Sequence, residues 1–380
     1  MGPATRPMVA ILVMLLAGAG LGAPRPCPAA EAAAGAPDWL HELTLNGFLA
    51  TSYSHGANHS ASGTNQFRVF DFDDAMFKLD VFELVLQKPV VNPRASGFRV
   101  DLASGSSIPR VSAAAGLFRD ASGTAGDLDL QQAFASYVAP LGSGLRLDLG
   151  KFVTHHGYEV IPGCDGWNDN ASRSFLFGYA IPFTHTGARA SYTFSPRAVG
   201  VFMLVNGWDV ARDNNRAKSV GGQLTLTPNA ALTLIVNGMV GPERPGNDHA
   251  SRRLLDLIAA WKAGPRLTLG GNADWGGEDD AVALGQDGSW RGFAGYARFV
   301  ACRQFTVSVR AEAFEDTDGL RTGVAQRLTG LTVTPETRLT PHLLLRGDLR
   351  VDRSDHDVFE KRLGLTDSQP TVLVEALYSF

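Results

Sequence analysis

Apolar and polar residues alternate with a period of two along most of this chain. In Leu145-Arg-Leu-Asp-Leu149, the leucines are separated by charged residues. The runs at 305–313 and 343–351 repeat this alternation, with Arg, Asp and Glu on the polar side. Because successive side chains of a β-strand point to opposite faces, these runs predict strands with one apolar and one charged face. Beyond the N-terminal residues, no segment shows a sustained helical period.

The connections between these runs alternate in length, which bears on the fold class. Short turns are expected at 140–144, 195–197, 228–230, 263–265 and 302–304. Longer polar stretches lie between them, at 54–76, 105–127, 153–182, 207–217, 241–251, 276–289, 315–324 and 353–369. This pattern is typical of an outer-membrane barrel with short periplasmic turns and long external loops. The prediction is therefore an all-β chain forming a single closed antiparallel transmembrane β-barrel of about sixteen strands.

The expected strands can be counted from where each alternating run begins. They begin near Leu43, Phe77, Gly97, Leu128, Leu145, Phe183, Ala198, Ser219, Ala231, Arg252, Leu267, Arg291, Phe305, Ala325, His342 and Thr371. An even number of strands leaves both termini of the chain on the side of the short turns.

The N-terminal residues carry the features of an export signal. An apolar run from Met8 to Ala23 follows Arg6 and precedes small residues, with cleavage expected near Ala30 or Ala32. This run is shorter than the ~20 residues of a transmembrane helix. We expect a signal peptide at 1–30, a short periplasmic segment at 31–42 and the barrel at 43–380.

The last run, Val372 to Phe380, also alternates and ends on an aromatic residue. Tyr378 and Phe380 are expected in the aromatic girdle at the periplasmic membrane boundary. The alternative is an ordinary strand of a soluble core. A terminal barrel strand would also be the segment that engages the barrel-assembly machinery.

Several short motifs together resemble the OmpL-like β-barrel porin family. They are Arg68-Val-Phe-Asp71, Glu83 to Pro89, Gly97 to Asp101, Leu149 to Phe152, Gly157-Tyr-Glu159, Pro182 to Gly187, Asn206-Gly-Trp208, Arg310-Ala-Glu312 and Leu345 to Asp352 with Phe359. The resemblance covers nearly all of the expected mature chain. It implies an outer-membrane channel similar to general diffusion porins, and it implies no catalytic residues.

The pleat predicts which charged groups face the interior of the barrel. Placing Arg or Lys on the lipid face costs roughly 2–4 kcal/mol each at the bilayer midplane, so the charged faces are assigned to the lumen. The expected pore-lining residues are Arg99, Asp101, Arg146, Asp148, Arg189, Asp274, Arg298, Arg310, Glu312, Arg346, Asp348, Arg350 and Asp352. About sixteen strands enclose more space than side chains fill, so the interior is expected to hold water.

The lumenal charges are mixed in sign, and many opposite charges lie two residues apart on one face. Such pairs could create a transverse field that orients dipolar solutes, or they could be wall salt bridges that stiffen the barrel. Because neither sign dominates, strong ion selectivity is not predicted.

The polar stretch 153–182 is the third external loop in this scheme. The hypothesis is that it folds inward and constricts the channel, with Glu159, Asp165, Asp169 and Arg173 opposite wall arginines. The alternative is a surface cap over the barrel mouth. Conductance of a variant lacking 163–170 distinguishes the two.

Composition excludes several other classes. The 380 residues carry a formal net charge of −4, roughly −6 after the expected cleavage, and therefore no basic nucleic-acid surface is indicated. Three cysteines exclude a disulfide scaffold and a four-cysteine zinc site. Cys164 and Cys302 are expected at opposite ends of the barrel, too far apart for a disulfide.

No cofactor or metal is predicted. The acidic segments 165–170 and 277–280 could supply oxygen ligands for calcium, but they lack the spacing of an EF-hand loop. His155 and His156 would point to opposite sides of an extended chain, which argues against a zinc site.

The sequence thus predicts a bacterial outer-membrane porin, a passive diffusion channel for small hydrophilic solutes or ions. The alternatives are a barrel enzyme of the lipase or protease type, which requires a nucleophile beside a base, and an adhesin or scaffold. The expected partners are outer-membrane lipid, the barrel-assembly machinery, small solutes and further copies in a homotrimer, with no nucleic acid.

Overall fold

The structure is a computed structural model that describes residues 41–115, 117–118 and 124–380. The expected signal peptide and its cleavage site lie outside the described residues. Among the described residues, no helix has the length and apolar character needed to cross a bilayer.

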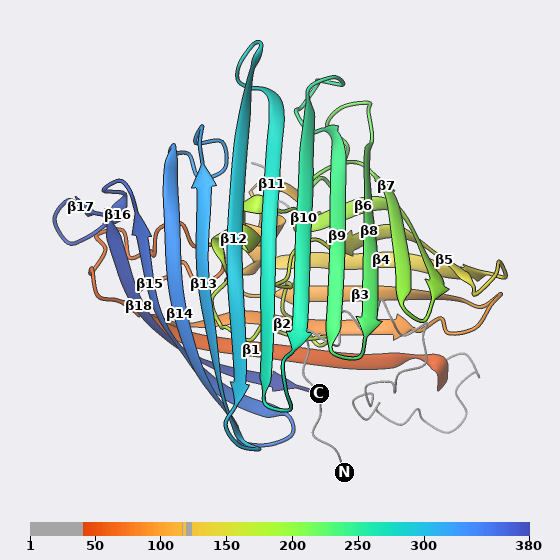
Figure 1. Cartoon of the computed structure of the whole chain (residues 1–380), viewed down its shortest axis with the longest axis horizontal. Helices are drawn as coiled ribbons and strands as arrows, with labels where there is room; N and C mark the ends of the chain where they lie inside the picture. The colour runs from red at the N-terminus through yellow and green to blue at the C-terminus, as the bar shows by residue number, and fades with distance from the viewer. Residues whose placement is uncertain (1–40, 116, 119–123) are drawn as a thin grey trace.

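Sixteen antiparallel strands close into one barrel (Figure 1). They are β1 (Thr44–Gly56), β2 (Met76–Lys88), β3 (Ser96–Ser104), β4 (Leu128–Ala139), β5 (Leu145–Val153), β6 (Thr184–Ser195), β7 (Ala198–Val205), β8 (Ser219–Asn229), β9 (Leu232–Pro242), β10 (Ser251–Lys262), β11 (Leu267–Ala283), β12 (Gln286–Val300), β13 (Phe305–Asp316), β14 (Gln326–Arg338), β15 (Leu343–Ser354) and β18 (Ser368–Ser379). Each strand pairs with its neighbours along the chain, and β18 pairs with β1 to close the barrel. The predicted fold class is confirmed.

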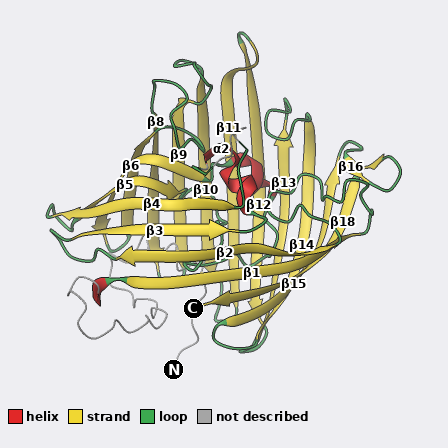
Figure 2. Cartoon of the chain, turned by 180° about the vertical axis from the view of Figure 1, so that it is seen from behind, coloured by secondary structure: helices red, strands yellow, loops and turns green. Residues whose placement is uncertain are grey.

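Three smaller elements lie in the external connections. The helix α2 (Ile108–Ala115) lies between β3 and β4, and the hairpin β16 (Phe359–Glu360) and β17 (Leu365–Thr366) lies between β15 and β18. A π-helical turn, η2 (Leu176–Ala180), lies between β5 and β6 and contacts β11 and β12 (Figure 2).

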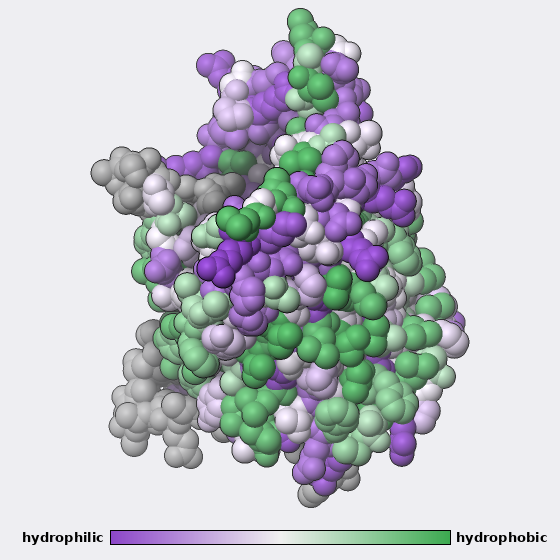
Figure 3. All heavy atoms as spheres, turned by 90° about the vertical axis from the view of Figure 1, so that its left-hand side faces the viewer, coloured by the Kyte–Doolittle hydropathy of each residue, from purple (hydrophilic) through white to green (hydrophobic). Residues whose placement is uncertain are grey.

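The period-two pattern determines which residues face lipid and which face the lumen. In β13, Ser308, Arg310 and Glu312 are buried, whereas Val309 and Ala311 are more exposed. The register pairs Arg310 with Tyr296 on β12 and with Thr332 on β14, so the polar face continues across neighbouring strands. Figure 3 shows apolar residues gathered over the lower part of one side of the barrel and hydrophilic residues above them. Exposed apolar side chains of β14, β15 and β18 include Leu331, Leu349 and Val374.

One predicted loop is wrong. The stretch 276–289 is not an irregular loop, because β11 and β12 continue through it as a paired hairpin that rises above the other strands (Figure 1). The strand expected to begin near Arg291 begins at Gln286 instead. Leu284 and Gly285 alone separate the strands, and Gly285 has the positive φ that a tight turn requires. Arg252 on β10 supports the extension through Glu278, at 2.6 Å.

The barrel closes at the C-terminus through a close contact between β1 and the last residue. Gly47 and Phe380 exchange backbone hydrogen bonds of 2.9 and 3.0 Å. The ring of Phe380 occupies the space beside Gly47, and a Cβ at Gly47 would lie 2.0 Å from that ring. Tyr378 is 42% exposed and Phe380 is 40% exposed, and their rings lie 6.2 Å apart at this end of the barrel.

Candidate functional site

The connection between β5 and β6, residues 154–183, lies inside the barrel and is called the inner loop here. Its backbone receives support from strands on widely separated parts of the wall. Gly157 N donates to Asp256 on β10 at 2.6 Å, and Cys164 N donates to Glu83 on β2 at 2.7 Å. Asp256 and Glu83 lie near the middle of their strands, on opposite parts of the wall, so the loop crosses the lumen and does not only cover its mouth.

The three acidic residues predicted for this loop each reach an arginine of the wall. Glu159 pairs with Arg310 at 2.9 Å and Asp165 pairs with Arg99 at 2.5 Å. Asp169 pairs with Arg298 at 3.1 Å. These arginines come from the adjacent strands β12 and β13 and from β3 on the opposite part of the wall, so the ion pairs hold the loop to both sides of the barrel.

The fourth predicted residue, Arg173, is placed differently. Its guanidinium lies 5.3 Å from the ring of Phe70 and donates to the carbonyl of Ala171 at 2.6 Å. Burial, together with the nearby Arg346, lowers the pKa of Arg173. The prediction placed the Arg173 side chain opposite wall arginines. Instead, the backbone carbonyl of Arg173 accepts a hydrogen bond from the wall residue Arg350, at 2.5 Å.

Charged wall residues also hold the backbone of the inner loop. Arg310 donates to the carbonyl of Ser172 at 2.7 Å, while Asp348 accepts from the amide of the same residue at 2.7 Å. Glu312 accepts from the amide of Phe175 at 2.5 Å. Such charge-assisted bonds to backbone groups are stronger than neutral ones. The wall charges therefore act as anchors for the loop.

Opposite charges two residues apart do form salt bridges along single strands. Arg310 lies 3.1 Å from Glu312, and Arg350 lies 2.7 Å from Asp352. Asp352 also accepts from Arg68 of the first external loop, residues 57–75, at 2.8 Å. The first external loop therefore bends inward as well.

The thirteen residues predicted to line the pore lie on the lumenal side of the wall in two groups. One group borders a large cavity and consists of Arg99, Arg146, Asp148, Arg189 and Arg298. The other group is buried at or beneath the folded-in loops and consists of Asp101, Asp274, Arg310, Glu312, Arg346, Asp348, Arg350 and Asp352.

Sequence reasoning missed an apolar cluster that fills the space around the inner loop. Phe70 of the first external loop packs on Phe177 and Phe183, with ring centroids 5.7 and 5.9 Å apart. From the wall, the indole of Trp290 donates to the carbonyl of Ala180 at 3.1 Å. The sequence does carry one signal of this cluster. Phe314 lies on the same face of β13 as Arg310 and Glu312, and this large apolar side chain on the lumenal face is fully buried.

Two spaces remain beside the inner loop. The larger, called the vestibule here, has a volume of about 1750 Å³ and opens among the short turns; it is lined by residues such as Arg146, Arg189, Tyr192, Arg266 and Arg298. The smaller, of about 30 Å³, lies between the inner loop, the first external loop, α2 and the strands β2 and β18. Both are lined by Gln131 and Ile161, so they adjoin.

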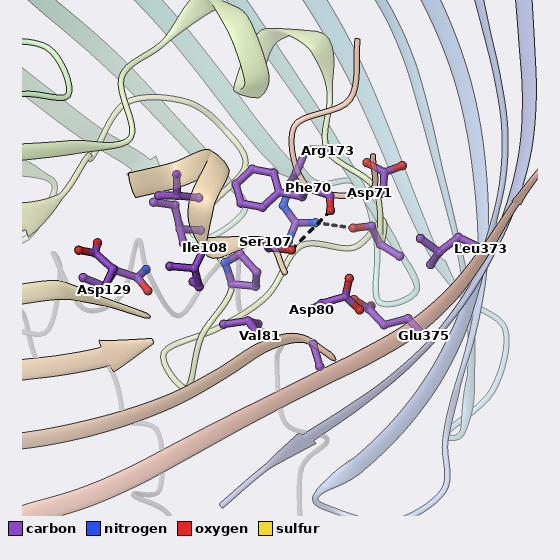
Figure 4. Close-up of a pocket in the computed structure, with 16 residues that line it drawn as sticks. Phe70, Asp71, Asp80, Val81, Ser107, Ile108, Asp129, Arg173, Leu373 and Glu375 are labelled. Carbon is purple, nitrogen blue, oxygen red and sulfur yellow. Dashed lines mark hydrogen bonds between the residues drawn. The ribbon is translucent and has the colours of Figure 1, made fainter. Parts of the chain in front are cut away.

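The small pocket carries four carboxylates, and each has a cationic partner. Figure 4 shows Asp80 and Glu375 beside one another near Leu373, with Asp129 at the far end. Asp129 pairs with Lys151 at 2.8 Å, and Asp80 pairs with Lys78 at 3.3 Å. The other pairs of this pocket are Asp71 with Arg68 and Glu375 with Arg346.

The expected geometry of the histidine pair is wrong. The rings of His155 and His156 stack with centroids 4.6 Å apart, because this segment is an irregular loop and not an extended strand. The ring centroids of His185 and His156 lie 6.0 Å apart. Within the described ranges, no group of three or more His, Cys, Asp or Glu residues is arranged to hold a metal ion.

The remaining candidate groups are also located. Asp165 and Asp169 of the acidic segment are engaged by arginines, and residues 277–280 belong to β11. Cys164 lies half-buried in the inner loop, whereas Cys302 is exposed in the turn between β12 and β13. Both are free thiols.

A closed sixteen-stranded barrel with short turns at one end and a loop folded into its lumen is the architecture of a porin. Solved porin structures share it. An anion-selective porin from Comamonas acidovorans is 12% identical with a TM-score of 0.62, covering 89% of this chain and 99% of that one. Pseudomonas putida OprB is 13% identical with a TM-score of 0.62, and the match covers 90% of this chain and 96% of that one. The channel DcaP of Acinetobacter baumannii is 10% identical with a TM-score of 0.61, and the match covers 89% of this chain and 97% of that one.

The family is shown by the sequence itself. Residues 42–380 match the family model described as "Putative beta-barrel porin-2, OmpL-like", and the chain belongs to this family. No curated protein matches the chain. The protein is an outer-membrane porin, a multi-pass β-barrel channel.

Proposed function

We propose that the inner loop is the constriction of this channel and that small hydrophilic solutes pass beside it. The observation that carries the proposal is the set of ion pairs from Glu159, Asp165 and Asp169 to three separate wall strands. A loop held at three positions across a cylinder must narrow it. In this proposal, the five predicted residues that border the vestibule line the pore, and two of them, Arg99 and Arg298, also anchor the constriction together with Arg310.

The path of the solute follows from the two spaces beside the loop. The vestibule can hold a hydrated small molecule, since its volume of about 1750 Å³ is large compared with the ≈ 30 Å³ that a water molecule occupies in the liquid. The small pocket, of about 30 Å³, is far smaller than the vestibule. It lies against the inner loop and adjoins the vestibule, so we propose that passage is limited there.

Deleting Gly163 to Asn170 tests this proposal. The deletion removes Asp165 and Asp169 and therefore two of the three ion pairs. We expect the single-channel conductance to rise at least twofold in planar bilayers. The matched control removes eight residues, 281–288, from the tip of the β11–β12 hairpin, and its conductance should equal that of the wild type. An unchanged conductance in the first variant, with a folded barrel, contradicts the constriction.

We further propose that the chain transports and does not catalyse, and that its partners are those of an assembled porin. Family membership supports the first point, and incubation with phospholipid or peptide substrates tests it, because turnover would contradict it. The exposed Tyr378 and Phe380 support a terminal strand that contacts lipid and the barrel-assembly machinery. Assembly as a homotrimer is tested by native mass spectrometry in detergent.

A further inference from the structure

The charges that line the vestibule are unequal in sign. Among the described residues that border it, ten are Lys or Arg and five are Asp or Glu. The basic residues are Lys88, Arg99, Arg146, Arg189, Arg197, Lys262, Arg266, Arg298, Arg303 and Arg338, and the acidic residues are Glu83, Asp148, Glu159, Asp165 and Asp169. The protein as a whole has a net charge of −4, so this excess of positive charge is local.

Four of the five acidic residues are neutralised by arginine partners. Asp148 lies 2.9 Å from both Arg146 and Arg189, so two guanidinium groups share one carboxylate there. Glu159, Asp165 and Asp169 are paired with Arg310, Arg99 and Arg298.

Several of the basic residues have no carboxylate partner among the described residues. Arg197, Arg266 and Arg303 lie in three different short turns and are exposed. Lys262 ends β10 at the same rim, and Arg338 ends β14 with its guanidinium donating to the carbonyl of Pro341 at 2.8 Å. These five residues, called the basic rim here, lie along the arc of the vestibule mouth between β6 and β14.

Further along the proposed path, the described acidic groups of the small pocket are neutralised by basic partners. The four carboxylates of the small pocket are each paired with Arg or Lys, and Arg173 adds one more positive charge. At the external end, Glu278 and Asp279 of the extended hairpin are paired with Arg252 and Arg253, at 2.6 and 2.7 Å, whereas Asp280 and Asp287 at its tip have no basic partner among the described residues.

We infer that the basic rim and the Arg146–Arg189 pair make the vestibule a binding region for small anions, and that the channel prefers anions to cations. A cleft with charge of one sign and low-dielectric walls focuses its field and raises the local concentration of counter-ions. Rim charges act through water over a Debye length of about 8–10 Å at 0.10–0.15 M salt, so the preference weakens at high salt. This inference rests on the proposed function, because it requires solutes to cross the vestibule.

The reversal potential in a KCl gradient across a planar bilayer tests the inference. For the wild type, we expect a permeability ratio of chloride to potassium above one, falling toward one as the salt concentration rises. The rim variant combines Arg197→Glu, Arg266→Glu and Arg303→Glu, and its ratio should fall at least threefold. The control variant combines Arg212→Glu, Arg353→Glu and Arg362→Glu, three exposed arginines at the external end, and its ratio should change less than the ratio of the rim variant.

Different results would overturn the anion preference and the channel function. A wild-type ratio at or below one, or an equal change in the rim and control variants, overturns the anion inference and leaves the channel intact. A folded protein that gives no conductance at all contradicts the proposed function instead. Heat-modifiable migration on a denaturing gel verifies that each variant is folded before its currents are compared.

Discussion

Replacing Arg310 by Met should detach the inner loop from the wall. Arg310 is fully buried and pairs with both Glu159 and Glu312, at 2.9 and 3.1 Å. It also donates to the carbonyls of Ser172 and Arg173, at 2.7 and 3.2 Å. Methionine fills a similar volume but offers no donor, so two carboxylates and two carbonyls lose a partner.

The size of the effect follows from these contacts. Removing one partner of a buried ion pair costs about 3–5 kcal/mol. Each buried carbonyl left without a donor adds about 1–3 kcal/mol if it stays dry. These costs do not simply add, because the loop can leave the wall and expose the groups to water. We therefore expect a loss of about 3–5 kcal/mol in the free energy that holds the loop, and a higher single-channel conductance.

Urea unfolding of the barrel and planar-bilayer recording measure the two effects. Arg291→Met is the matched control, since Arg291 pairs with Glu315 at 2.8 Å but both side chains are exposed to solvent. An exposed pair contributes about 0–1 kcal/mol, so this variant should resemble the wild type. The reasoning is refuted if Arg310→Met and Arg291→Met lose the same stability and conduct alike.

Four further predictions concern other parts of the molecule. Gly47→Val should lower the heat resistance of the folded band, because its Cβ would overlap the Phe380 ring and force that ring to move, and the added change Phe380→Ala should restore the heat resistance. Leu349→Arg places a charge on the lipid face and should cost roughly 2–4 kcal/mol in urea unfolding, against a smaller loss for Leu349→Ala. Burial raises the pKa of Glu243 to about 7, above the 4.3 of an unfolded glutamate, so its contribution to stability is present at low pH and is lost as pH rises toward 7; Glu243→Gln should flatten this pH dependence of the thermal midpoint. A maleimide should label Cys302 quickly and Cys164 only after unfolding, because burial raises the pKa of the Cys164 thiol, and equal rates in the folded protein would contradict this placement.

The barrel could be predicted from sequence because its pattern is local. Each strand shows its two faces within a few residues, so most predicted starts, such as Leu145 and Phe305, coincide with the observed ones. The β11–β12 extension was missed because its acidic and glycine-rich sequence is typical of a loop. Its strand pairing depends on ion pairs from β10, which are distant in sequence.

The interior was harder to predict for a physical reason. The pleat gives the side of the wall on which Arg310 lies, but whether that side chain meets water or a folded loop depends on the path of residues 154–183. Glu159, Asp165 and Asp169 could be predicted as candidates, yet the anchoring of backbone carbonyls by Arg310 and Arg350 has no local signature in the sequence. The unequal charge of the vestibule depends on which arginines share a carboxylate, which only the pairing across strands reveals.

Single-channel recording of the purified, folded protein in a planar bilayer, with polyethylene glycols of increasing size added to the salt solution, tests the central claim most directly. The account predicts discrete current steps that small polymers reduce by entering the vestibule and that larger, excluded polymers leave unchanged. Folded barrels that give no steps, or steps equally insensitive to polymers of every size, would contradict a water-filled path beside the inner loop.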